Sequence, residues 1–410
     1  MGGAVNIKTA TLSGGLRCVA RQVSGVTECC GVTFNSGSRD EIADADHGLA
    51  HFVEHTIFKG TSRRSGSYVL NRMEAVGGEL NAFTTKEETT VYSLMPAGNF
   101  RRATRLIGEL ASDSAFPEKG LTLEREVVCD EIDSYLDSPA EAAYDLFDEM
   151  FFAGNPLAHN ILGRKQTVTD FTGERCRRYL RERFAADNGV YFYLGPEDPE
   201  RVFREAERAF ASLPPCAVVS PRLAPAECRP EVTVRDNGSH QCHTVMGTAV
   251  GGLHDPSRHV IAFAVNILGG PGMNSLLNLA LRERNGLVYT VEASTALYSD
   301  CGLMSIYFGC DHSDLEKCRK LVGYTLERFA EKQLTDRQLA AYKRQYLGQL
   351  TIGCDNKEQL ALNSGRALLH RLAIPQFDIT AARVESITSS QLHEAAVRLA
   401  SAPLRALTLA

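Results

Sequence analysis

The chain has 410 residues, a length that predicts two or three domains, each large enough to bury a core without help from disulfides or metals. Its 44 basic and 50 acidic residues leave a net charge of −6, which argues against a nucleic-acid binder that relies on a basic surface. With 44% hydrophobic and 23% charged residues, the composition is that of a soluble globular protein and not of a disordered one.

The twelve cysteines are dispersed, and no two form a C-x-x-C pair, so neither a zinc ribbon nor a thioredoxin-type redox site is indicated. Scattered thiols, together with an N-terminal segment that lacks the features of a secretory signal, predict a reducing, cytoplasmic location. The longest uncharged stretch, 260–281, is interrupted by Gly269, Gly270, Pro271 and Gly272, so we expect no membrane span.

The first half of the chain mixes strand and helix patterns. Val, Thr and Tyr are frequent in residues 28–35 and 89–95, which predicts strands there. Apolar residues spaced near 3.6 predict five helices. These cover residues 43–59, 67–76, 100–112, 121–136 and 140–151.

Five prolines among small and polar residues predict an extended linker over 214–230. This linker separates an N-terminal domain, 1–213, from a C-terminal domain of similar size, 231–410. The second domain has predicted strands at 244–250, 288–298 and 302–309, and predicted helices at 258–268, 274–284, 314–332 and 336–353. Both domains are therefore predicted to be α+β, each with helices packed on a largely antiparallel sheet.

The strongest chemical signal is the sequence His-Phe-Val-Glu-His at residues 51–55, within the predicted helix 43–59. His51 and His55 are four residues apart, so on a helix they project from the same face and can share one metal ion. Glu54 lies beside them and can reach a water on that metal without being a ligand. This H-x-x-E-H order inverts the familiar H-E-x-x-H zinc motif.

His47 extends the histidine spacing by another four residues. A helix rises about 1.5 Å per residue, so His47 and His55 would lie about 12 Å apart along the axis. They cannot both bind one ion together with His51, and a third ligand must come from elsewhere.

The predicted helix 121–136 carries several acids, among them Glu124 and Glu131. These two are seven residues apart and share a helix face, so either could complete a His₂Glu site, the usual set for a catalytic zinc with one open position. The alternative for an acidic helix is a solvated face without a metal.

These motifs together resemble the pitrilysin/insulinase family of zinc peptidases, specifically its short two-domain members related to mitochondrial processing peptidase. The resemblance rests on SGSRDE at 36–41, GLAHFVEH at 48–55 and FKGT at 58–61. It rests further on GGELNAFT at 77–84 and on EREVV at 124–128, followed by Glu131.

The resemblance implies that His51, His55 and Glu131 bind one zinc ion per chain, that Glu54 is the general base, and that Glu124 orients a ligand histidine. It further implies that residues 80–84 form an exposed strand edge, where a substrate peptide is bound as an added strand. The strand residues in that role would be Leu80, Asn81, Ala82 and Phe83, with Asn81 and Ala82 flanking the scissile bond. Without the family, Asn81 in a short Gly-bounded run is typical of a turn.

In the C-terminal domain, LRERNGLVY at 281–289 resembles the family's Arg/Tyr element, which implies that Arg282 and Tyr289 contact the substrate and act in catalysis. The simpler interpretation is a helix that ends before Gly286 and an ordinary strand tyrosine. Upstream, the Gly-rich turn 269–275 is not followed by the Lys-Ser/Thr of a phosphate-binding loop. Leu276 stands where many members of the family carry Arg.

The expected function is that of a zinc endopeptidase that cleaves peptides or small unfolded polypeptides inside an enclosed chamber. Two alternatives remain: a catalytically silent structural or chaperone-like subunit, and the metal-carrying subunit of a heteromeric processing peptidase. The resemblance implies that two domains make half of a clamshell, so we expect a homodimer, with a heterodimer as the alternative. We expect neither nucleic-acid nor membrane partners.

Overall fold

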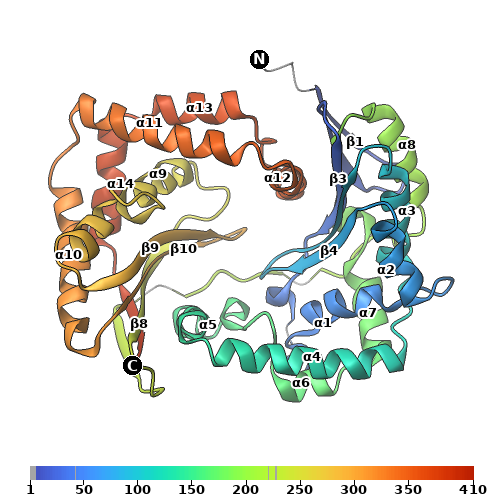
Figure 1. Cartoon of the computed structure of the whole chain (residues 1–410), viewed down its shortest axis with the longest axis horizontal. Coiled ribbons are helices and arrows are strands. Elements are labelled where there is room, and N and C mark those ends of the chain that lie inside the picture. The colour runs from blue at the N-terminus through green and yellow to red at the C-terminus, as the bar shows by residue number, and fades with distance from the viewer. Residues whose placement is uncertain (1–5, 42, 220, 227–228) are drawn as a thin grey trace. The chain divides into compact units, whose positions relative to one another are not determined.

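The computed structural model describes residues 6–41, 43–219, 221–226 and 229–410 (Figure 1). The chain forms two compact units. The first unit comprises Met1–Ser134, His159–Leu223 and Cys354–Pro375, and the second comprises Tyr135–Ala158, Ala224–Gly353 and Gln376–Ala410. The chain passes from the first unit to the second within the predicted linker 214–230, between Leu223 and Ala224. Each unit also includes one segment from the other side of this linker: Cys354–Pro375 in the first unit and Tyr135–Ala158 in the second. The contiguous boundaries 1–213 and 231–410 do not anticipate this exchange.

The first unit contains a six-stranded sheet in the order β1-β2-β6-β3-β5-β4. Only β2 and β6 pair in parallel, so the sheet is largely antiparallel. Its strands are β1 (Asn6–Thr11), β2 (Arg17–Gln22), β3 (Thr27–Phe34), β4 (Glu79–Thr84), β5 (Thr89–Pro96) and β6 (Gly189–Gly195). Strand β4 is at the edge of the sheet, so one side of its backbone has no partner strand there.

The two faces of this sheet are covered by helices from different parts of the sequence. Side chains alternate along each strand, so Tyr191 and Tyr193 of β6 face one core while Phe192 faces the other. Most helices of the unit pack on the first face: α1 (Leu49–Thr56), α2 (Gly66–Glu74), α3 (Phe100–Asp113), α4 (Glu118–Leu136), α7 (Gly173–Arg183) and α8 (Pro199–Ala209). Helix α12 (Lys357–Leu369), which comes from far along the chain, covers the second face. A short helix, α6 (Lys165–Thr169), precedes α7.

The second unit contains a five-stranded sheet in the order β7-β11-β8-β10-β9, in which β7 and β11 are the parallel pair. Its strands are β7 (Glu231–Arg235), β8 (Cys242–Val250), β9 (Val288–Leu297), β10 (Gly302–Cys310) and β11 (Arg405–Leu409). Helices α9 (Arg258–Gly269), α10 (Leu315–Glu331) and α14 (Ser389–Ser401) share a core with one face. Helix α5 (Pro139–Phe151) covers the other face. Helices α11 (Asp336–Gly353) and α13 (Phe377–Ser386) pack on each other.

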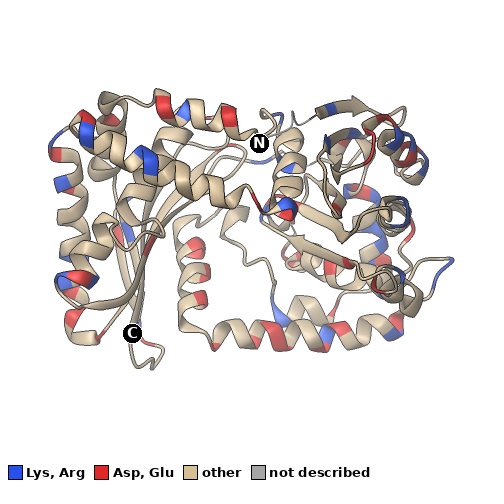
Figure 2. Cartoon of the chain, turned by 45° about the horizontal axis from the view of Figure 1, so that its top comes forward, with Lys and Arg blue, Asp and Glu red and all other residues tan. Residues whose placement is uncertain are grey.

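The two sheets have the same topology. If β1 is set aside, the strands of each sheet follow one another in the same spatial order, with the first and last strands parallel and the third at the edge. The prediction of two similar α+β units with largely antiparallel sheets is thereby confirmed. Basic and acidic residues are interspersed on the helices of both units (Figure 2).

The predicted helix 43–59 is wrong in its first part. The structure has a short 3-10 turn at Asp44–Asp46, then α1, then another 3-10 turn at Ile57–Lys59. Gly48 precedes α1 with φ of 88°, a left-handed conformation that a continuous helix excludes. The predicted helix 274–284 is also shorter in the structure. Its main part is the π-helical segment η6 (Asn278–Glu283). Among the described residues, no helix has both the length and the apolar character needed to cross a bilayer.

Candidate metal centre

The helix that carries H-x-x-E-H is fixed at its N-terminus by a buried carboxylate. Glu41 accepts hydrogen bonds from the backbone N–H groups of Gly48 (2.8 Å) and Ala50 (2.7 Å), which have no partner within the helix. Burial raises the pKa of Glu41 well above its usual range, and the two amide bonds act in the opposite direction. A Cβ on Gly48 would lie 2.6 Å from the carbonyl oxygen of Leu162. Glycine and Glu41 together set where α1 begins.

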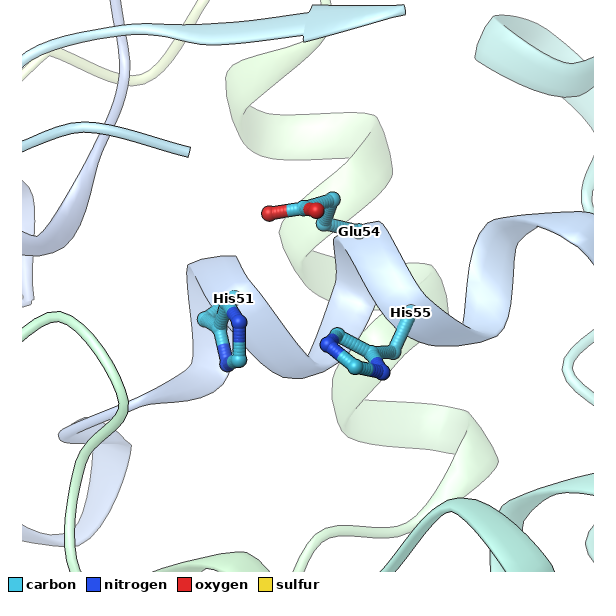
Figure 3. Close-up of side chains that lie close together, drawn as sticks. All are labelled: His51, Glu54 and His55. Atoms are coloured by element: carbon cyan, nitrogen blue, oxygen red, sulfur yellow. The ribbon is translucent and has the colours of Figure 1, made fainter. Parts of the chain in front are cut away.

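His51 and His55 project from the same side of α1, as their spacing predicts (Figure 3). Their ring centroids are 4.5 Å apart, and one ligand atom from each ring and from Glu54 lies within 4.8 Å of the other two. Burial, together with the neighbouring His55, lowers the pKa of His51 to about 3, so its imidazole is neutral at physiological pH. A neutral imidazole is the form that binds a metal.

Helix α4 brings two glutamates to these histidines. Oε2 of Glu131 is 3.3 Å from Nε2 of His55 and 3.8 Å from Nε2 of His51. Oε2 of Glu124 is 3.2 Å from the other nitrogen of His55, Nδ1, and Lys59 pairs with the same carboxylate. The residues alone leave the choice of third ligand open, whereas this geometry places Glu131 between the histidines and Glu124 behind one of them.

The group fits a zinc ion. Two ligands at about 2.0–2.1 Å from a tetrahedral zinc are roughly 3.3 Å apart, and the His55–Glu131 separation is 3.3 Å. A ligand histidine usually bonds its second nitrogen to a carboxylate, which is the relation of His55 to Glu124. Two imidazoles and one carboxylate form a common donor set of catalytic zinc.

Glu54 lies one turn along α1 from the His51 ring (Figure 3). Burial raises the pKa of its carboxyl group, and the nearby Glu131 acts in the same direction. His55 and Thr84, the last residue of β4, act in the opposite direction. A carboxylate with a raised pKa accepts and returns a proton more readily at neutral pH than an ordinary glutamate.

Strand β4 contacts α1 and reaches Glu54 with Thr84. Leu80 and Ala82 pack against the core that includes α1, while Phe83 packs against the core that includes α12. Asn81 is a strand residue paired with Tyr92, and the interpretation as a turn is wrong because β4 continues unbroken from Glu79 to Thr84. The C-terminal end of this edge strand therefore lies beside Glu54 of the metal group.

Arg282 and Tyr289 belong to the second unit and form a group of their own. The guanidinium carbon of Arg282 lies 5.8 Å from the centre of the Tyr289 ring, and the ring is 84% exposed. Both line a hollow along the edge strand β9, next to Gly269, Gly270 and Pro271 of the Gly-rich turn. Arg282 is in the π-helical segment η6, which ends before Gly286, and Tyr289 is in strand β9, as the simpler interpretation predicts. The role of this pair in substrate contact stays a prediction.

His47 lies outside the metal group, because Gly48 separates it from α1. His47 is 2% exposed, and its ring contacts that of His159 in a tilted arrangement, with the ring centroids 3.6 Å apart. Two residues that support the metal group, Glu41 and Lys59, could not be predicted from the sequence. Glu41 has no recognisable capping signal in the sequence, since it lies eight residues before the first residue of α1. Lys59 becomes a partner of Glu124 only through the fold.

This fold and site define a class: an α+β protein with a metallopeptidase-type H-x-x-E-H helix facing an acidic helix. Comparison with known families agrees. Insulinase (Peptidase family M16) matches residues 19–165, and the Peptidase M16 inactive domain matches residues 170–346. An uncharacterized zinc protease of Streptomyces coelicolor is 30% identical over 398 residues, which cover 95% of this chain and 86% of that protein. The chain therefore belongs to the insulinase (M16) family, as one of its short members.

Further relatives match this chain over most of their own length. An uncharacterized zinc protease of Bacillus subtilis is 28% identical over 363 residues, covering 88% of this chain and 87% of that protein. Among solved structures, a protease from Helicobacter pylori has a TM-score of 0.92 at 19% identity and covers 99% of this chain and 100% of its own. A Pseudomonas fluorescens protein described as a peptidase M16 inactive domain has a TM-score of 0.91 at 17% identity, covering 98% and 97%. These two structures support the fold alone.

Proposed function

We propose that the chain is a zinc-dependent endopeptidase, with His51, His55 and Glu131 as metal ligands and Glu54 as general base. The observation that carries the proposal is the position of His55, whose two nitrogens lie 3.3 Å from Glu131 and 3.2 Å from Glu124. A solvated acidic helix would not direct two carboxylates to opposite edges of one imidazole. The naming of relatives as zinc proteases supports the same function.

A zinc ion held by these residues would supply Lewis-acid chemistry, acidifying a water and polarising a peptide carbonyl. Glu54 accepts a proton as the water oxygen adds to the carbonyl carbon, and its raised pKa suits this exchange. It then donates that proton to the leaving nitrogen as the carbon–nitrogen bond breaks. Glu124 holds the ring of His55 through Nδ1, and Lys59 forms an ion pair with the same carboxylate of Glu124.

The substrate peptide is proposed to pair with β4 through its backbone, as an added strand. The edge position of β4 supports this, because the backbone N–H and C=O groups on its outer side have no strand partner in the sheet. Alternate side chains of the bound peptide would then lie beside Leu80 and Ala82 on one face and beside Asn81 and Phe83 on the other. Because Thr84 at the end of β4 lies beside Glu54, a peptide paired with β4 would pass close to Glu54.

The active assembly is proposed to be a homodimer, in which Arg282 and Tyr289 of one copy serve the metal centre of the other. The exposed Tyr289 ring and the hollow beside it support a role in contact with a ligand. Arg282 would hold a substrate carbonyl, and the Tyr289 hydroxyl would donate a hydrogen bond to the carbonyl oxygen as that atom gains charge. Activity that persists fully in a monomer would contradict this assembly.

The decisive experiment replaces Glu54 by Gln. We expect Glu54→Gln to keep its zinc, measured by elemental analysis, and to lose about 10²–10⁴-fold or more in cleavage of a quenched fluorescent peptide. Glu126→Gln is the matched control, because Glu126 is an exposed residue of α4 and should leave both properties unchanged.

Zinc content and peptide cleavage, measured on the purified parent chain without any other protein, distinguish the peptidase from the silent subunit and from the heteromeric peptidase. Cleavage at the parental rate by Glu54→Gln would refute the mechanism. Zinc without any cleavage would favour the silent subunit, and cleavage that appears only with a second protein would favour the heteromeric peptidase.

A further inference from the structure

A second ligand site is suggested by a pocket that lies wholly in the second unit. It has a volume of about 530 Å³ and lies between η6, α10 and the beginning of α11. Pockets of this size commonly hold small organic ligands. None of its lining residues belongs to the metal centre or to the Arg282 and Tyr289 group.

Apolar side chains from all three elements form much of the pocket wall, together with the polar residues Asn285, Thr325 and Gln338. The principal wall residues are Leu276, Leu279, Leu321, Leu334, Tyr324 and Tyr342. The four leucines are only partly buried, and the Tyr324 ring is 57% exposed, so water reaches an apolar surface here. Exposed apolar surface that is gathered in a hollow marks a binding site more often than scattered apolar residues do.

Three cations accompany these walls: Arg284 after η6, Arg328 on α10, and Lys332 at the end of α10. Arg328 pairs with Glu331. Arg284 and Lys332 have no ion pair within the described part of the chain and are exposed. The pocket thus combines an apolar interior with an excess of positive charge.

The wall formed by η6 is held in place. The side-chain amide of Asn285 donates a hydrogen bond to the carbonyl oxygen of Ala280 at 2.8 Å, which ties the segment after η6 back to the wall. Arg284 and Asn285, which follow η6, both line the same pocket. A preformed pocket costs less conformational entropy on binding than one that must be assembled.

We propose that this pocket binds an amphiphile with an alkyl tail and a single anionic head group, such as a fatty carboxylate. The tail lies against the leucines and the tyrosine rings, and the head group pairs with Arg284 and Lys332. A fully polar anion leaves the apolar walls exposed to water, and a neutral or cationic amphiphile leaves the cations without a partner.

The test is isothermal titration calorimetry of the full-length chain with dodecanoate below its aggregation threshold. We expect one site per chain and an affinity that falls as salt rises. Shorter carboxylates should bind roughly fourfold more weakly for each methylene removed, as expected for buried methylenes. Dodecanol and dodecylamine should bind at least about tenfold more weakly than dodecanoate.

A matched pair of variants tests the head-group contact. Arg284→Glu should weaken dodecanoate binding by about tenfold or more. Lys320→Glu makes the same kind of charge change on an exposed residue of α10 outside the pocket and should leave binding unchanged. No binding to the parent, equal binding of dodecanol, or equal loss in both variants would overturn the proposal. Glu54→Gln should bind dodecanoate like the parent, so the site and the proposed peptidase activity are tested separately.

Discussion

The two units share one strand order, yet only one of them carries a metal group among the described residues. In the first unit the first α-helix after β3, the second strand of the shared arrangement in chain order, is α1, with His51, Glu54 and His55. In the second unit the corresponding helix is α9, whose buried residues are all apolar or Gly. The fold therefore provides the position, and a few polar residues on one helix provide the chemistry.

The two units also differ in how many charged side chains they bury. The first unit buries many ionisable side chains, including Glu41, Glu87, Glu88, Arg39 and Glu124, whereas the buried charged side chain of the second unit in the described residues is Lys343. Charges are costly to bury without partners. In the first unit these charges have partners, such as Arg39 with Glu87 and Glu88 with His370. The stability of the first unit should therefore depend on buried ion pairs more than that of the second unit.

The largest expected effect is on zinc affinity, which only the first unit is proposed to have, and it concerns the two glutamates of α4. Glu131→Gln should lower zinc affinity by more than about 100-fold, and Glu124→Gln by about 10–100-fold, as is typical for a partner of a ligand. Competition with a chelator measures both. If Glu124→Gln lost more zinc than Glu131→Gln, the assignment of the third ligand would be reversed.

The next effect concerns the beginning of α1. Gly48→Ala forces a side chain into a left-handed backbone and against the Leu162 carbonyl oxygen at 2.6 Å. Gly98→Ala is the control, since Gly98 has φ of 97° with no atom within 4 Å of an added Cβ. In urea unfolding we expect Gly98→Ala to cost about 1 kcal/mol and Gly48→Ala to cost about 1–3 kcal/mol more. Equal losses would show that crowding at Gly48 does not matter.

The smallest effect concerns pH. Burial alone would raise the pKa of Glu88, but His370 and Arg366 outweigh it and hold that pKa below its usual value. A depressed carboxyl pKa adds stability above the unfolded-state value, and that stability is lost as pH falls through the folded-state value. Glu88→Gln should therefore destabilise the chain by about 1–3 kcal/mol at neutral pH, and by less as pH falls. An urea-unfolding difference that is independent of pH would contradict this.

The sequence predicted the parts of this molecule that depend on local spacing. His51, Glu54 and His55 share a helix, and the acidic segment became α4. The break at Gly48 was missed because it requires φ of 88°, which the close approach of Leu162 and Gly163 imposes. The choice between Glu124 and Glu131 depends on which nitrogen of His55 each one meets, and no spacing rule contains that information. The buried strand β6 and its parallel pairing with β2 likewise depend on contacts between distant segments.

The exchange of α5 and α12 has a consequence for how the chain can be divided. A backbone cut within 214–230 would leave α5 on the fragment that contains the first sheet and α12 on the fragment that contains the second. Each fragment would then lack the helix that covers one face of its own sheet, and would retain a helix whose native contacts belong to the other. Neither piece is a self-sufficient folding module, and we expect the two to regain their native cores only as a complementing pair.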